Sequence, residues 1–153
     1  MGKTLRMAEL DGFANLIPLD HGLVVVSTAR ADGTIQSSVV NAGILDHPLR
    51  GGRVVGFVSA GSSRRLTNLR ARARATVVIR AGWRWAGVEG PVVLAGPDDP
   101  LPGVDGGRLR LLLRDIFSSA GGTHDDWDEY DRVMAAERRV AVLVEPERTY
   151  GVG

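Results

Sequence analysis

The chain of 153 residues is long enough for one domain, residues 1–153, with a hydrophobic core of its own. It has no cysteine, which excludes disulfide scaffolds, iron–sulfur clusters, thiolate zinc sites and cysteine nucleophiles. No apolar run approaches the ~20 residues that cross a bilayer, and the N-terminus lacks a signal-peptide core. The sequence therefore predicts a soluble cytoplasmic protein with no membrane contact.

The formal net charge of +1 conceals a strong asymmetry. No aspartate or glutamate occurs between Asp46 and Glu89, and residues 47–88, hereafter the acid-free stretch, carry nine arginines. The rest of the chain sums to −8. This pattern predicts an anionic partner at one place on the surface. Because all basic residues except Lys3 are arginine, we attribute part of the arginine content to codon bias, and the absence of acids carries the inference.

The N-terminal half predicts helices and short strands in alternating groups. Apolar spacing predicts an amphipathic helix over residues 7–19, limited by Pro18. Strands over 22–30 and 34–45 are joined by the hairpin turn Ala31-Asp32-Gly33, and a third strand covers 53–59. Residues 61–70 then return to a helical period, with Ser62 or Ser63 as the candidate N-cap.

The C-terminal half predicts three more strands and two helices. The strands are residues 74–80, 83–94 and 139–144, and the helices are residues 108–120 and 125–137. Hairpin-length links and the lack of regular β-α alternation argue against a doubly wound sheet. The predicted fold is mainly β with peripheral α: a six-stranded antiparallel barrel with short helices.

Two arginines stand at the start of the helix in the acid-free stretch. Arg64 and Arg65 follow Ser63, in the first turn, where they work against the positive end of the helix dipole unless an anion lies there. Backbone amides, serine hydroxyls and two guanidinium groups would give a phosphate many donors. The alternative is that both arginines simply point into water.

Three further patterns have structural and functional interpretations. Trp83 and Trp85 flank Arg84 on a predicted strand, so both indoles should share one face and stack a planar ring or fill a core. Residues 125–131 hold five acids, which complement a helix dipole or meet the arginines of another protomer. The three histidines are scattered, and we predict no metal site.

No known catalytic motif occurs in the sequence. It lacks a Gly-x-Ser-x-Gly elbow, a Walker phosphate loop, a dinucleotide-binding Gly-x-Gly-x-x-Gly and a His-Glu-x-x-His helix. We therefore assign no catalytic residue. If the protein is an enzyme, a bound cofactor performs the chemistry while the protein binds and orients it.

The order and spacing of several segments resemble a known superfamily. These segments are Phe57-Val58-Ser59, the helix from Ser63 to Ala71, the strand from Arg74 to Ile79, Gly82-Trp83, Val88-Glu89-Gly90, Ala120-Gly121-Gly122, His124, Asp126-Trp127, Glu129-Tyr130, Arg138-Arg139-Val140 and Tyr150-Gly151. Together they resemble the pyridoxamine 5′-phosphate oxidase-like split β-barrels, whose fold binds flavin mononucleotide (FMN). Within them, the chain is similar to the branch of flavin/deazaflavin oxidoreductases that uses coenzyme F420.

The resemblance implies a homodimer with two cofactor clefts at the subunit interface. It implies hydride transfer between F420 and a small conjugated organic acceptor. Ser37, Ser38, Val58 and Ser59 would border the deazaflavin; Ser63, Arg64, Arg65 and Asn68 would bind phosphate; and Trp83 would lie near the ring or the tail. The phosphodiester and polyglutamate tail of F420 would explain the acid-free stretch.

Other functions remain open from the sequence. An FMN-dependent flavoprotein could use the same barrel, and a non-catalytic protein could bind F420 without turnover. The least favoured alternative is a nucleic-acid-binding barrel that would use the arginines on phosphates and the tryptophans for stacking.

Overall fold

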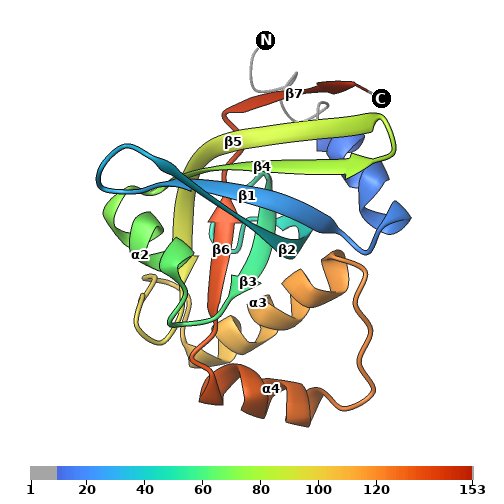
Figure 1. Cartoon of the computed structure of the whole chain (residues 1–153). Helices are drawn as coiled ribbons and strands as arrows, with labels where there is room; N and C mark the ends of the chain where they lie inside the picture. Colours follow the sequence, from blue (N-terminus) through green and yellow to red (C-terminus); the bar gives the residue numbers. More distant parts are fainter. Residues whose placement is uncertain (1–9, 153) are drawn as a thin grey trace.

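The computed structural model describes residues 10–152, and within this part of the chain seven strands form one antiparallel sheet (Figure 1). The strands are β1 (Leu23–Ala29), β2 (Ile35–Asp46), β3 (Arg53–Ser59), β4 (Arg74–Ala81), β5 (Arg84–Ala95), β6 (Val140–Val144) and β7 (Arg148–Val152). Their order is β4-β1-β2-β3-β6-β5-β7, and an additional β4–β5 pairing closes the first six into a barrel. The predicted six-stranded antiparallel barrel is confirmed.

Strand β7 was not predicted. It pairs with β5 in the register Gly87↔Tyr150, outside the closed barrel. The Tyr150 ring lies over Gly87, where a Cβ would collide with it, and meets the Trp85 indole edge-on at a centroid distance of 6.1 Å. A glycine in β5 is thus what lets the extra strand pack.

Helices α2, α3 and α4 each begin at a side-chain cap. Helix α2 (Arg64–Ala71) is capped by Ser63, α3 (Gly106–Ser119) by Asp105 and α4 (Trp127–Ala136) by Asp126. Each cap side chain accepts a hydrogen bond from the backbone N–H three residues later, as expected for helix starts. The predicted helix over 61–70 therefore begins three residues later than expected, after its serine cap.

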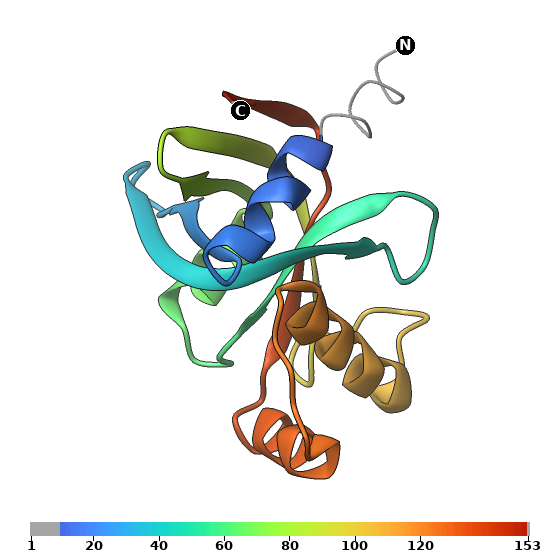
Figure 2. The same cartoon turned by 90° about the vertical axis from the view of Figure 1, so that its right-hand side faces the viewer.

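The N-terminal helix is shorter than predicted within the described residues. Residues 10–16 are α-helical, Ile17–Leu19 form a 3₁₀ turn (η1) around Pro18, and predicted residues 7–9 lie outside the described part. Figure 2 shows this helix, in blue, across one end of the barrel. Phe13 and Leu16 enter the interior there, while Leu66 and Leu69 of α2 close the opposite end.

A second apolar layer holds α3 against the outside of the barrel. Leu112, Leu113 and Ile116 of α3 pack on Val54 and Leu143. Strand β6 is buried along its whole length because it faces the barrel interior on one side and α3 on the other. No helix within residues 10–152 is long and apolar enough to span a membrane.

The barrel is split between β2 and β3. Strand β2 pairs with β1 over residues 35–41 but with β3 only from Ala42 onward. Beyond the Ala42↔Phe57 pair the two strands diverge, and Val58 and Ser59 pair only with β6. The divergence leaves one edge of residues 35–41 without a strand partner, beside the start of α2.

Candidate functional site

The Arg65 side chain crosses the split between β2 and β3. Its Nε donates to Ser38 Oγ of β2 at 3.3 Å, and its Nη1 donates to Ser59 Oγ of β3 at 3.3 Å. The Ser59 and Ser63 hydroxyls lie 2.8 Å apart, so the helix cap joins the same network. Four of the predicted cofactor-binding residues are therefore brought together, from three different elements.

Arg65 carries a charge that no acid balances. Its side chain is half-buried, and within residues 10–152 it forms no ion pair with a carboxylate. Burial lowers its pKa, and repulsion from the Arg139 guanidinium lowers it further. A partly desolvated cation without a counter-charge is unfavourable in the free protein, so this geometry favours an anionic ligand.

The start of α2 adds donors to the same place. No acidic residue stands in its first turn, and Ser63 accepts from Leu66 N at 3.3 Å, which leaves other N-terminal amides open. Arg64 is exposed, and no side-chain partner for it occurs among the residues that the structure describes. The helix dipole, Arg64 and Arg65 together make this a cationic site.

Asn68 lies beneath this site with both of its amide hydrogens engaged. Its Nδ2 donates to Thr28 Oγ1 at 3.1 Å and to Gln36 Oε1 at 2.9 Å, and the residue is buried. These bonds tie α2 to the end of the barrel. In this arrangement Asn68 holds the helix in position and offers no free N–H to an anion, so its role in phosphate binding stays a prediction.

Ser37 and Ser38 point to opposite sides of β2, as neighbours on a strand must. Ser38 faces Arg65, whereas the Ser37 hydroxyl lies 2.9 Å from that of Ser27 on the outward face of the sheet. Val58 lines a hollow on the outer side of β3. Ser37 and Val58 therefore both border the split, Ser37 from β2 and Val58 from β3.

Trp83 lies far from the cationic site within the same chain. The prediction that it shares a strand face with Trp85 is wrong, because Trp83 is in the β4–β5 turn and only Trp85 is in β5. Trp83 is 95% exposed. The eight-residue strand β4 separates it from α2 (Figure 1). Its contact with a cofactor stays a prediction.

The acid-free stretch is less positive in space than in sequence. Four of its nine arginines pair with carboxylates from outside the stretch: Arg50 with Glu145, Arg53 with Asp11, Arg70 with Asp99, and Arg74 with Glu147. Arg80 and Arg84 lie at the β4–β5 turn, at the opposite end of the barrel from α2. The interpretation of all nine as one surface around α2 is therefore wrong, because barrel closure distributes them.

A hollow of about 340 Å³ opens beside the split. Asn41 and Val58 form its floor on the outer sheet face, while Phe117 of α3 and Tyr130 of α4 line it from the helices. Arg139, which follows α4, also lines it. Sequence analysis assigned no site role to this arginine, because it lies outside the acid-free stretch and comes near Arg65 only through the fold.

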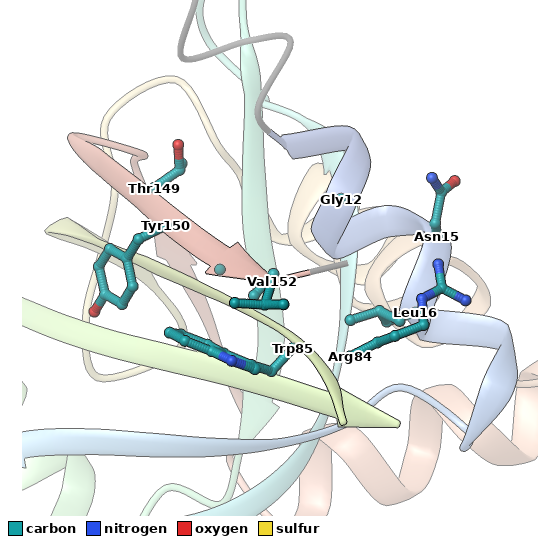
Figure 3. Close-up of a pocket in the computed structure, with 10 residues that line it drawn as sticks. Gly12, Asn15, Leu16, Arg84, Trp85, Thr149, Tyr150 and Val152 are labelled. Atoms are coloured by element: carbon teal, nitrogen blue, oxygen red, sulfur yellow. The ribbon is translucent and has the colours of Figure 1, made fainter. Parts of the chain in front are cut away.

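A second hollow, of about 400 Å³, lies between β5, β7 and the N-terminal helix. Trp85, Tyr150 and Val152 line one part of it, and Asn15 and Arg84 lie at the other (Figure 3). None of the predicted cofactor-binding residues lines it.

Among residues 10–152, no cluster of three or more histidine, aspartate or glutamate side chains could hold a metal ion.

Comparison with known proteins identifies the architecture. No family model matches the chain. A conserved hypothetical protein from Mycobacterium tuberculosis superposes with a TM-score of 0.67 at 16% identity, over 92% of this chain and 82% of its own. A structure described as an F420 reductase gives 0.59 at 16% identity, over 89% and 94%. A pyridoxamine 5′-phosphate oxidase-related, FMN-binding protein from Nostoc punctiforme gives 0.63 at 10% identity, over 94% and 80%.

These identities are low, so the likeness concerns the fold. The chain has the split-barrel fold that pyridoxamine 5′-phosphate oxidase-related proteins and an F420 reductase share. A fold hosts many functions, so the ligand has to be argued from the site.

Proposed function

We propose that this protein is an oxidoreductase that binds coenzyme F420 at the split and exchanges a hydride between it and a small conjugated organic acceptor. The observation that carries the proposal is Arg65, a half-buried guanidinium without a carboxylate, held across the split by Ser38 and Ser59 at the start of α2. Such a guanidinium can bind a phosphate through charge-assisted hydrogen bonds.

The residues around the split fit the rest of the cofactor. One edge of β2 over residues 35–41 lacks a strand partner, so backbone N–H and C=O groups there are open to the polar edge of a planar ring. Val58 offers an apolar surface beside that edge. When bound, the deazaflavin supplies hydride chemistry, and the protein's contribution is binding, orientation and the exclusion of water. The proposal therefore needs no protein nucleophile.

A homodimer with clefts at its interface belongs to the same proposal. The outward face of the sheet is apolar and exposed at Leu23, Val25, Ile35, Val39, Tyr150 and Val152. An apolar patch of this kind marks an interaction surface. Ser37 lies on this face, next to the split. A second copy that covers the face would therefore bring the interface to the cofactor.

FMN is the second candidate. The four arginine–carboxylate pairs leave a smaller positive surface than the sequence suggested, and a single phosphate needs fewer cations than a phosphodiester with an acidic tail. A protein that binds FMN shares the fold. The unpaired Arg64 and Arg65 suit either phosphate group.

Titration of the cofactor-free protein with F420 and, separately, with FMN tests the proposal through cofactor fluorescence. We expect saturable F420 binding and weaker FMN binding. Tight FMN binding without an F420 response would overturn the F420 assignment in favour of a flavoprotein. F420 binding without oxidation of reduced F420 in an acceptor screen would indicate a carrier. Nucleic-acid binding with a steep salt dependence would support the least favoured alternative.

A further inference from the structure

We infer that the hollow beside the split is the acceptor site and that it selects flat conjugated acceptors with an acidic group, which Arg139 binds. The inference rests on the proposed function, because it assigns the second reactant of that reaction. The hollow shares Val58 with the predicted ring site and contains no other residue predicted to bind cofactor. It is therefore adjacent to the cofactor site and separate from it.

The walls of this hollow suit a planar molecule. Phe117 and Tyr130 line it with ring centroids 5.2 Å apart, and Met134 adds a flexible thioether. The Tyr130 hydroxyl donates to Leu113 O at 3.0 Å, so its polar end is satisfied and its ring is held in place. Aromatic faces and a polarisable sulfur bind conjugated rings well.

Arg139 gives the hollow its charge. It is the only Arg, Lys, Asp or Glu among the described residues that line the hollow. Arg139 Nε donates to Glu137 Oε1 at 2.8 Å, and Arg139 Nη2 lies 2.8 Å from the same oxygen. This pair fixes the guanidinium and leaves its other N–H groups for a ligand. Repulsion from the Arg139 guanidinium lowers the pKa of Arg65, so the two arginine charges lie near each other at the split. A carboxylate or phenolate on the acceptor would relieve that repulsion.

Backbone strain occurs in the hollow at His21 and beside it at Arg138, the residue before Arg139. Among residues 10–152, only His21 (φ 59°) and Arg138 (φ 51°) are non-glycine residues with positive φ. His21 lines the hollow, and its carbonyl accepts from Asn41 Nδ2 at 2.7 Å. Strain of this kind persists where the surroundings determine it and is common at functional sites.

Arg138 is the residue that directs Arg139 into the hollow. It ends α4 in the left-handed conformation, with Arg138 N bonded to Ala135 O and Arg139 N to Met134 O. A two-point ion pair between Arg138 and Asp98 anchors this turn to the loop after β5. The direction in which Arg139 leaves the helix is therefore built into the fold.

The test compares two probes on the full chain: 1,4-naphthoquinone-2-carboxylate and the neutral 1,4-naphthoquinone. Dissociation constants are measured by calorimetry, with and without oxidised F420, for the wild type and Arg139→Gln. We expect about a tenfold weaker binding of the carboxylate in Arg139→Gln, as for loss of a charge-assisted hydrogen bond, and less than a twofold change for the neutral quinone. Arg132→Gln, an exposed residue of α4 that lines neither hollow, is the matched control and should change neither constant.

Met134→Trp supplies a second, charge-independent variant. It should weaken both probes because it fills the hollow, and the F420 affinity should stay within twofold. Unchanged carboxylate binding in Arg139→Gln, or an equal loss for both probes, would overturn the inference. Titration of the same samples with F420 separates the two proposals: a wild type that does not bind F420 removes the proposed function, whereas F420 binding with charge-independent probe binding removes only the acceptor assignment.

Discussion

Two arginines on different helices, Arg65 on α2 and Arg114 on α3, have opposite surroundings. Arg114 donates from Nε to Asp131 Oδ1 at 3.0 Å and from Nη2 to Oδ2, and its guanidinium lies 5.3 Å from the Trp127 ring centroid. The hydrogen bond with Asp131 raises its pKa, whereas burial lowers the pKa of Arg65. Arg114 joins two helices, while among the described residues Arg65 forms side-chain hydrogen bonds only with serine hydroxyls.

The difference separates a structural charge from one available to a ligand. Between α3 and α4, the Arg114 guanidinium is part of the packing, because Asp131 neutralises its charge and the Trp127 ring covers it. At the split, the serines orient Arg65 without neutralising it. An uncompensated cation is a stability cost that natural sites carry where a ligand needs it. The same residue type thus has two roles here: Asp131 neutralises Arg114, whereas no carboxylate among the described residues neutralises Arg65.

Reversing the charge at the split gives the largest expected effect. Arg65→Glu should weaken F420 binding at least tenfold, about 1.4 kcal/mol or more, because it places an anion at the phosphate site. Fluorescence titration measures this loss, and circular dichroism checks that the fold is intact. Arg132→Glu makes the same charge change on an exposed part of α4 and should bind F420 normally. An Arg65→Glu protein with wild-type affinity would show that the cation serves something other than the cofactor.

Removing the structural charge is expected to have the next largest effect. Arg114→Met should lower the melting temperature by about 2–4 °C, because Asp131 then keeps only Arg110, at 3.4 Å, and the contact with Trp127 changes. Asp131 has a lowered pKa, mainly through the Arg114 hydrogen bond, so its stabilising contribution is present at neutral pH and disappears as the pH falls through the folded-state pKa. A thermal scan at pH 7 should therefore separate the variant from the wild type, and the difference should shrink as the pH is lowered below the unfolded-chain aspartate pKa of 3.8.

The matched substitution at the split should act in the opposite direction. Arg65→Met keeps the approximate side-chain volume and removes the unpaired cation, so the melting temperature of the cofactor-free protein should rise by about 1–2 °C. Ser59 and Ser63 keep their mutual hydrogen bond in this variant. A fall as large as that of Arg114→Met would mean that Arg65 is part of the structural framework and would remove the distinction between the two arginines.

Local sequence signals predicted most of the fold. The strands follow from β-branched runs and turn residues, and the cap of α2 from a serine before a helical period; the structure confirms both, with Asp32 Oδ1 accepting from Thr34 N in the first hairpin. These features depend on neighbours in the chain. Ser63 and Arg65 were identified as candidate site residues for the same reason, because a helix N-terminus and the charges beside it are formed by consecutive residues.

The features that sequence analysis missed depend on residues far apart in the chain. Strand β7 exists because Gly87 leaves room for Tyr150, sixty-three residues later. Arg139 becomes part of the site only when β6 is placed beside β3. The charge sum of the acid-free stretch misled because its partners, such as Glu145 and Asp99, come from other segments. Periodicity contains none of this information.

His47 extends the comparison to a cation that can lose its charge. It is buried in the β2–β3 loop, its Nδ1 accepts from Leu49 N at 3.1 Å, and its Nε2 has no partner among the described residues. Burial, reinforced by Arg50, lowers its pKa, so the ring stays neutral where a guanidinium such as that of Arg65 cannot. Because the unfolded chain takes up the proton first, stability should fall as the pH drops below the unfolded value of about 6.5. His47→Asn keeps an acceptor for Leu49 N but has no group that titrates in this range. Its urea midpoint should therefore fall less than that of the wild type when the pH is lowered from 7.5 to 5.5. This difference should be the smallest of the effects predicted here. Parallel pH dependences in the two proteins would show that the buried imidazole does not contribute.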